Sequence, residues 1–259
     1  MRSISVCDED MTPEEAKEFE EGYYKYYKNL IKAKDPLDYT FDEEFDTAIE
    51  CMYYESVSSY GVFGMIEFHF NSLYRHFQYT KRFAAAYEKI ANDHYDKNFK
   101  EAYGTELADV AFEAAPRDEL TNLTCQSTLL MVYSVFEGFL RDVVEYVVKH
   151  VGNNKDILKY PYNDFTAAKY INYLNKQNVF IPKALYREFN EVRLVRNYYA
   201  HSLEEPQKNL LQYLKNDPYG ILKGSYITVN PDYIEHVFEL LGKMVDSIEE
   251  TFIENYGRG

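Results

Sequence analysis

The chain has 259 residues, of which 46% are hydrophobic and 17% aromatic, with 27 Tyr, 17 Phe and no Trp. This length can bury a sizeable core in one domain or in two small ones. Only 11 Gly and 8 Pro occur, too few for a loop-rich β fold or a disordered chain. The formal net charge of −15 argues against a general nucleic-acid coat protein.

The sequence shows no secretory signal, and no apolar run approaches the roughly 20 residues of a membrane span. Cys7, Cys51 and Cys125 are far apart and fit neither a zinc site nor a disulfide framework. We therefore expect a soluble, cytoplasmic protein without a membrane partner, a metal or a cofactor.

Nearly every segment predicts an α-helix. Thr12-Pro13-Glu14-Glu15 combines a capping Thr, a Pro at the first helical position and a Glu that completes a capping box, so a helix is expected to about Lys34. Residues 41–92 predict one long helix, or two broken near residues 61–64. Its apolar residues recur at helical spacing, namely Phe63, Ile66, Phe70, Leu73 and Phe77.

The second half of the chain predicts further helices over 118–150, 164–176, 182–201 and from Asn230-Pro231 to about Asn255. Residues 226–229 are the best strand candidate. The first of these helices is expected to bury Leu123, Leu130, Val132, Val135, Phe136, Phe139, Leu140, Val143, Val144 and Val147. The fold class is therefore all-α: a bundle of long amphipathic helices over 116–259, with an acidic, aromatic-rich helical annex over 1–115.

Charge is distributed unevenly along the chain. Residues 151–215 carry ten basic and six acidic side chains, a net charge of +4, whereas residues 1–50 carry 6 basic and 15 acidic side chains. The basic stretch is either ordinary variation across a solvated surface or a local anion site on a protein that otherwise repels polyanions.

The most informative stretch is residues 193–201, which contains Arg-Asn-x-x-x-His formed by Arg196, Asn197 and His201. An imidazole can transfer a proton near neutral pH, and a guanidinium can hold a phosphate. Together they can cleave RNA without a metal, through attack of a ribose 2′-OH on the adjacent phosphate. His201 would be the base, the acid, or both in alternation across two subunits, and Arg196 would stabilise the phosphate charge. Asn197 would orient the imidazole or the phosphate.

Helix geometry leaves the arrangement of this motif open. Arg193, Asn197 and His201 fall on one stripe, whereas Arg196 and His201 are about 140° apart around an ideal helix. The latter pair converges if the helix unwinds at His201, or if two copies face each other across a two-fold axis. A purely structural alternative is an ion pair of Arg196 with Glu191 or another carboxylate, and a charged His201 at a helix C-terminus.

The Arg-Asn-x-x-x-His motif at a helix end resembles the signature of the HEPN superfamily, all-α domains that include many metal-independent ribonuclease toxins. Residues 133–142, with the sequence YSVFEGFLRD, resemble an early core helix in which an acidic residue, here Glu137, faces the motif. The resemblance covers about 117–256. It implies RNA cleavage at a homodimer interface to give a 2′,3′-cyclic phosphate, with Arg196 and His201 catalytic and Asn197, Glu137 and Arg193 supporting.

The resemblance also implies a toxin or antiviral defence role, with a possible antitoxin or sensor protein as partner. HEPN toxins silenced by a nucleotidyltransferase often carry Tyr two positions after the His, and this chain has Leu203 there. The alternative function is a non-catalytic helical module that binds a nucleotide or a protein. A metal site formed by His69, His76 and Glu67 is a weaker candidate, because the sequence offers no third ligand at a spacing typical of metal sites.

Overall fold

The computed structural model describes residues 12–37, 43–51, 54–102, 119–151, 167–201, 206 and 208–258. The all-α prediction is confirmed, because the described elements are helices apart from one short hairpin. In chain order they are α1 (Pro13–Ala33), α2 (Glu43–Cys51), α3 (Gly61–Ala102), α5 (Glu119–Val151), α6 (Ala167–Lys176), α7 (Lys183–His201), α8 (Lys208–Tyr213), β1 (Leu222–Lys223), β2 (Tyr226–Ile227) and α9 (Pro231–Tyr256).

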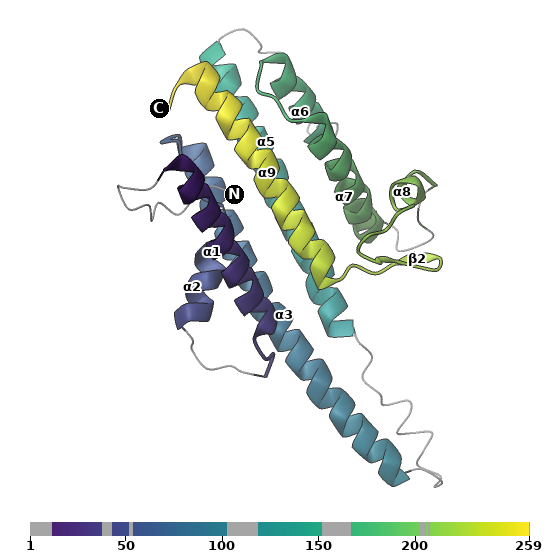
Figure 1. Ribbon diagram of the computed structural model, residues 1–259. Coiled ribbons are helices and arrows are strands. Elements are labelled where there is room, and N and C mark those ends of the chain that lie inside the picture. The colour runs from purple at the N-terminus through teal and green to yellow at the C-terminus, as the bar shows by residue number, and fades with distance from the viewer. Residues whose placement is uncertain are drawn as a thin grey trace.

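The helices form a bundle around α5 and α9, which lie side by side at its centre (Figure 1). Helix α3 flanks this pair on one side, α2 contacts α3, and α1 contacts α2. Helices α6 and α7 flank it on the other side, with α8 and the hairpin at the end of α7. The two outer layers therefore lie on opposite sides of the central pair.

Helices that precede and follow residue 116 in the sequence, where a boundary between annex and bundle was expected, share one apolar core. Phe63 of α3 packs edge-on against Phe139 of α5 and Phe252 of α9, with ring centroids 5.6 and 5.4 Å apart. Each of these side chains is at most 4% exposed. Helix α3 thus shares its core with α5 and α9, while the boundary itself stays a prediction.

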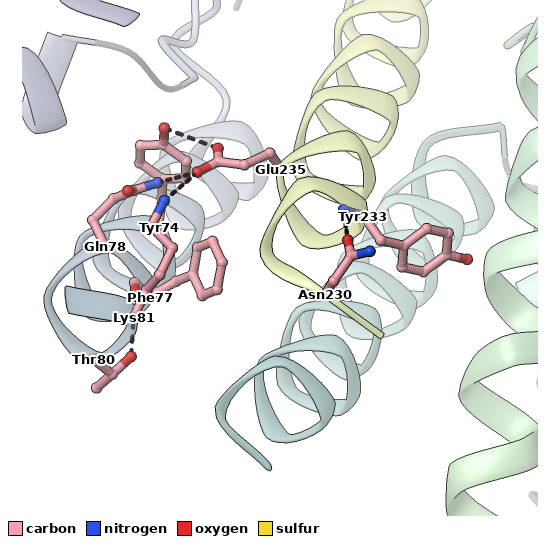
Figure 2. A network of polar contacts seen from close by, with 8 residues as sticks. All are labelled: Tyr74, Phe77, Gln78, Thr80, Lys81, Asn230, Tyr233 and Glu235. Carbon is pink, nitrogen blue, oxygen red and sulfur yellow. Dashed lines mark hydrogen bonds and ion pairs between the residues drawn. The ribbon is translucent and has the colours of Figure 1, made fainter. Parts of the chain in front are cut away.

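Polar contacts also join α3 to α9 (Figure 2). Glu235 accepts hydrogen bonds from Gln78 Nε2 at 2.6 Å, Lys81 Nζ at 2.9 Å and Tyr74 Oη at 3.2 Å. Gln78 is fully buried, and a buried amide N–H without an acceptor would destabilise the fold. Glu235 provides that acceptor for Gln78 Nε2. The three donors share one face of α3 because they are spaced about one helical turn apart.

Helix α9 begins as the sequence predicts. The side chain of Asn230 accepts a hydrogen bond from the backbone N–H of Tyr233 at 2.9 Å, and Pro231 occupies the first turn. This cap satisfies one of the amide groups that a helix start leaves without a partner. The local signals were sufficient here because an N-cap depends only on neighbouring residues.

Other boundaries and faces differ from the expectation. Of the two alternatives for residues 41–92, two separate helices are found, but the interruption lies between Cys51 and Gly61, and residues 61–64 form the first turn of α3. Helix α3 also continues to Ala102 rather than ending near residue 92. Leu123 was expected in the core and is instead 54% exposed, because the buried face of α5 passes through Cys125 and Leu129. The strand candidate pairs with Leu222–Lys223 as a hairpin, with Gly224 at a φ of 64° in its turn.

Among the described residues, one helical stretch, Leu120–His150, is long and apolar enough to span a membrane. It forms most of α5, which contacts α3, α6, α7 and α9. The core helix of a soluble protein passes the same test, so this stretch is weak evidence for a membrane location. A cytoplasmic location stays a prediction.

Candidate functional site

The predicted motif lies in the C-terminal half of α7. Phe189, Val192 and Val195 are fully buried, and α7 contacts α5 and α9. This helical periodicity places the buried residues on one face and leaves Arg193, Arg196 and Asn197 half-buried at its edge. The motif residues are therefore held by a rigid helix that is packed on the core.

The guanidinium of Arg196 is positioned by two neighbours. Its Nη1 donates a hydrogen bond to Asn197 Oδ1 at 3.1 Å, and its Cζ lies 5.2 Å from the ring centroid of Tyr133 on α5. The second contact is a cation–π interaction. Within the described part of the chain Arg196 has no carboxylate partner, so the ion pair considered with Glu191 is not found. Its Nε is buried and has no hydrogen-bond partner there.

Tyr133 is a site residue that the sequence reasoning did not identify as one. Its ring stacks on Phe189 of α7, with centroids 5.6 Å apart and planes 4° apart, and only 3% of the side chain is exposed. Burial raises the pKa of Tyr133; Glu137 reinforces the shift, and Arg193 and Arg196 oppose it. The charges of three predicted site residues, Glu137, Arg193 and Arg196, therefore all affect the pKa of Tyr133. The sequence signal that could have identified Tyr133 is its position one helical turn before Glu137, on the same face of the helix.

The supporting residues have structural partners of their own. Arg193 donates from Nε to Asn190 Oδ1 at 3.3 Å, one turn earlier on α7. Glu137 accepts a hydrogen bond from the backbone N–H of Ala167 at 3.2 Å, at the first residue of α6. A carboxylate at a helix N-terminus is favoured by the exposed amide groups there. The structure therefore gives Glu137 a role in holding α6.

The helical backbone of α7 extends through His201, so no unwinding occurs before that residue. The side chain of His201 and the whole of Leu203 lie outside the described residues. With a helix up to position 201, Arg196 and His201 leave the axis about 140° apart. Because α7 ends at His201, both arrangements open from the sequence, an unwound helix end at His201 and two facing copies, stay predictions.

The two tyrosines inside the motif are used for packing. Tyr199 donates a hydrogen bond to the carbonyl of Ile227 at 2.7 Å and accepts one from the N–H of Val229 at 3.1 Å. Tyr198 is 7% exposed and packs edge-on against the ring of Tyr199. These contacts attach the hairpin to α7 beside the motif.

A separate titratable cluster occupies the other edge of α7. Burial, reinforced by the charges of Asp217 and Glu188, raises the pKa of Glu191 to about 7. On α9, His236 stacks on Tyr219 with centroids 4.7 Å apart, and burial lowers its pKa against the opposing charges of Glu188 and Glu239. The sequence reasoning missed this cluster because its members are brought together only by the packing of α7 and α9.

The metal-site candidate receives no support in the part of the chain that the structure describes. There, no group of three or more His, Cys, Asp or Glu side chains is arranged to hold a metal ion. His69 and His76 are exposed on α3, and Glu67 accepts a hydrogen bond from the N–H of Ser56 at 2.9 Å.

No protein-family model matches the chain, and no curated protein or solved structure is significantly similar to it.

Proposed function

We propose that the protein is a metal-independent endoribonuclease of the HEPN type. The observation that carries the proposal is the position of Arg196, which lies five residues before His201. Its guanidinium is held between Asn197 and the ring of Tyr133. Phosphodiester cleavage by a 2′-OH uses a group that transfers protons and a cation that stabilises the phosphate charge, and His201 and Arg196 would supply these two groups. The net-basic charge of residues 151–215 also supports an anionic substrate.

The proposed reaction is a transesterification. The 2′-oxygen of a ribose forms a bond to the adjacent phosphorus while the bond from phosphorus to the 5′-oxygen breaks. One His201 accepts the 2′-OH proton and a second donates a proton to the leaving 5′-oxygen, which yields a 2′,3′-cyclic phosphate and a 5′-OH. Arg196 stabilises the charge that develops on the non-bridging oxygens. Two facing α7 helices would supply both imidazoles in one cleft.

The decisive experiment compares wild type with His201→Ala on a labelled total-RNA substrate. We expect the variant to lose cleavage, because an acid and a base are both removed, while its circular dichroism spectrum is unchanged. His150→Ala, at an exposed position near the end of α5, is the matched control and is expected to cleave normally. Wild-type cleavage by a folded His201→Ala protein would reject the proposal.

The same assay tests independence from metals. We expect cleavage to continue in EDTA, since the mechanism uses no Lewis acid. Activity that disappears in chelator and returns with a divalent cation would instead assign the reaction to a metal site.

The biological role proposed here is that of a toxin or antiviral defence effector in the cytoplasm, restrained by an antitoxin or sensor protein. It is tested by induced expression in a bacterial host, where wild type is expected to stop growth and His201→Ala is not. Leu203 in place of Tyr argues against silencing by a nucleotidyltransferase acting at that position.

One observation favours the alternative, a non-catalytic module that binds a nucleotide or a protein. The Nε of Arg196 is buried, so this side chain also serves as packing between α7 and α5. The alternative predicts that RNA or a nucleotide binds without being cleaved. Fluorescence anisotropy with a labelled RNA, followed by analysis of the recovered RNA on a gel, separates the two.

A further inference from the structure

Helix α3 exposes a row of large apolar side chains on the face opposite the core. These residues, named here the α3 stripe, are 44–65% exposed and are Met65, Phe68, Tyr79, Phe83, Tyr87 and Ile90. At 100° per residue all six fall within about 100° of arc. The same helix buries Phe63, Phe70 and Phe77 on the other side. A helix that is apolar on two opposite faces normally has a second partner.

The spacing of the stripe is symmetric along the helix. With the exposed residues Ser72 and His76 included, the intervals between successive positions are 3, 4, 4, 3, 4, 4 and 3. The series reads the same in both directions. An antiparallel copy of α3 would therefore place each position opposite another member of the stripe. The facing pairs would be Met65 with Ile90, Phe68 with Tyr87, Ser72 with Phe83 and His76 with Tyr79.

The apolar area is of the size that a dimer needs. Large side chains bury about 200 Å² each, so the stripe exposes roughly 650 Å² of side chain per chain. A standard interface buries about 800 Å² on each partner. Polar neighbours on α3 would supply the remaining rim. A membrane surface is a poorer match, since the chain carries a net charge of −15 and anionic lipids would repel it.

We propose that a second copy of this chain docks antiparallel along the α3 stripe to form a two-fold homodimer. This interface is distinct from the one proposed for RNA cleavage, because α3 and α7 lie on opposite sides of the α5–α9 pair (Figure 1). A dimer at the stripe leaves both α7 helices accessible, so it can form with or without the catalytic pairing.

The first test is light scattering at micromolar concentration on the full chain. Wild type is expected at twice the chain mass or more, and a Phe68→Glu/Phe83→Glu variant is expected to dissociate at least 100-fold more readily. Both side chains are already more than half exposed, so the substitutions leave the folded monomer intact. Phe180→Glu, at a 52% exposed apolar position beside α7, is the control and should associate as wild type does.

The second test fixes the orientation. A Met65→Cys/Ile90→Cys variant is expected to form disulfide-linked dimers on mild oxidation, whereas Met65→Cys alone is not. The two positions are about 37 Å apart along one helix, so they cannot join within one copy. A disulfide between the two copies of residue 65 in the Met65→Cys variant, identified by peptide mapping, would indicate parallel helices and overturn the antiparallel arrangement.

A monomeric wild type would overturn the proposal. The proposal would also be overturned if Phe68→Glu/Phe83→Glu left the dimer intact while Arg193→Glu dissociated it. That result would place the dimer interface at α7. Neither result depends on whether the protein cleaves RNA.

Discussion

At the scale of single residues, Arg196 depends on the planar shape of its guanidinium as well as on its charge. It reaches the amide oxygen of Asn197 and the ring of Tyr133 at the same time. A lysine ammonium is a point charge without a flat face, and it cannot grip two phosphate oxygens as a fork does. A lysine at position 196 would therefore not reproduce the contacts of the arginine.

We predict that Arg196→Lys lowers the rate of RNA cleavage by at least about 100-fold, the loss typical of removing one transition-state donor. Single-turnover cleavage of a labelled RNA measures this directly. Arg187→Lys, at an exposed position of the same helix, controls for the change of residue type. If Arg196→Lys cleaves as fast as wild type, Arg196 acts only as a distant charge or as packing.

Glu191 provides a prediction about pH. Its pKa rises from 4.5 to about 7 in the folded protein, mainly because it is buried. Ionisation therefore costs stability in the folded state, and this cost grows as the pH rises from about 4.5 to about 7. Glu191→Gln, which is neutral at every pH, should be more stable than wild type above pH 7.

The measurement is the thermal midpoint of both proteins across this pH range. The advantage of Glu191→Gln should shrink on acidification and vanish below about pH 4.5, where the wild-type carboxyl becomes protonated in the unfolded state as well as in the folded state. Glu254→Gln, at an exposed position, should show no such trend. A constant difference at all pH values would show that packing, and not ionisation, separates the two proteins.

At the scale of elements, α9 fixes the segment that precedes α3. The carboxylate of Glu249 is fully buried and accepts four hydrogen bonds from this segment. Its donors are Tyr54 Oη, Ser56 Oγ and the backbone N–H groups of Val57 and Ser58, at distances of 2.7–3.1 Å. Residues almost 200 positions apart are joined in this way.

We predict that Glu249→Ala lowers the free energy of unfolding by about 3 kcal/mol or more, since several buried donors lose their acceptor at once. Urea denaturation followed by circular dichroism gives this value. Glu254→Ala, on the exposed face of the same helix, is expected to change it by less than about 0.5 kcal/mol. Equal effects of the two substitutions would mean that the hydrogen bonds to Glu249 contribute little.

At the scale of the whole molecule, the layered bundle separates the two faces for which functions are proposed. The central α5–α9 pair separates the α3 stripe on one side from the motif helix α7 on the other. The net charge of −15 would disfavour RNA over most of the surface, whereas residues 151–215 carry a net charge of +4. If RNA is the substrate, such a distribution would direct it to the α7 side.

The sequence by itself determined the fold class, most helix positions and the location of the motif, because these depend on periodicity and on nearest neighbours. The cap at Asn230 and the buried face through Phe63, Phe70 and Phe77 are examples. Helical spacing repeats every few residues, so it is visible without any knowledge of distant contacts.

Only the tertiary structure decided which groups from different helices meet. The ring of Tyr133 under Arg196, the donors around Glu249 and the stack of Tyr219 on His236 each join separate elements. Leu123 shows the same limit, because the described helices that pack on α5 bury the face through Cys125 and Leu129 and leave this side chain exposed. Periodicity states which residues share a face of a helix, but the packing of the other helices determines which part of that face is buried.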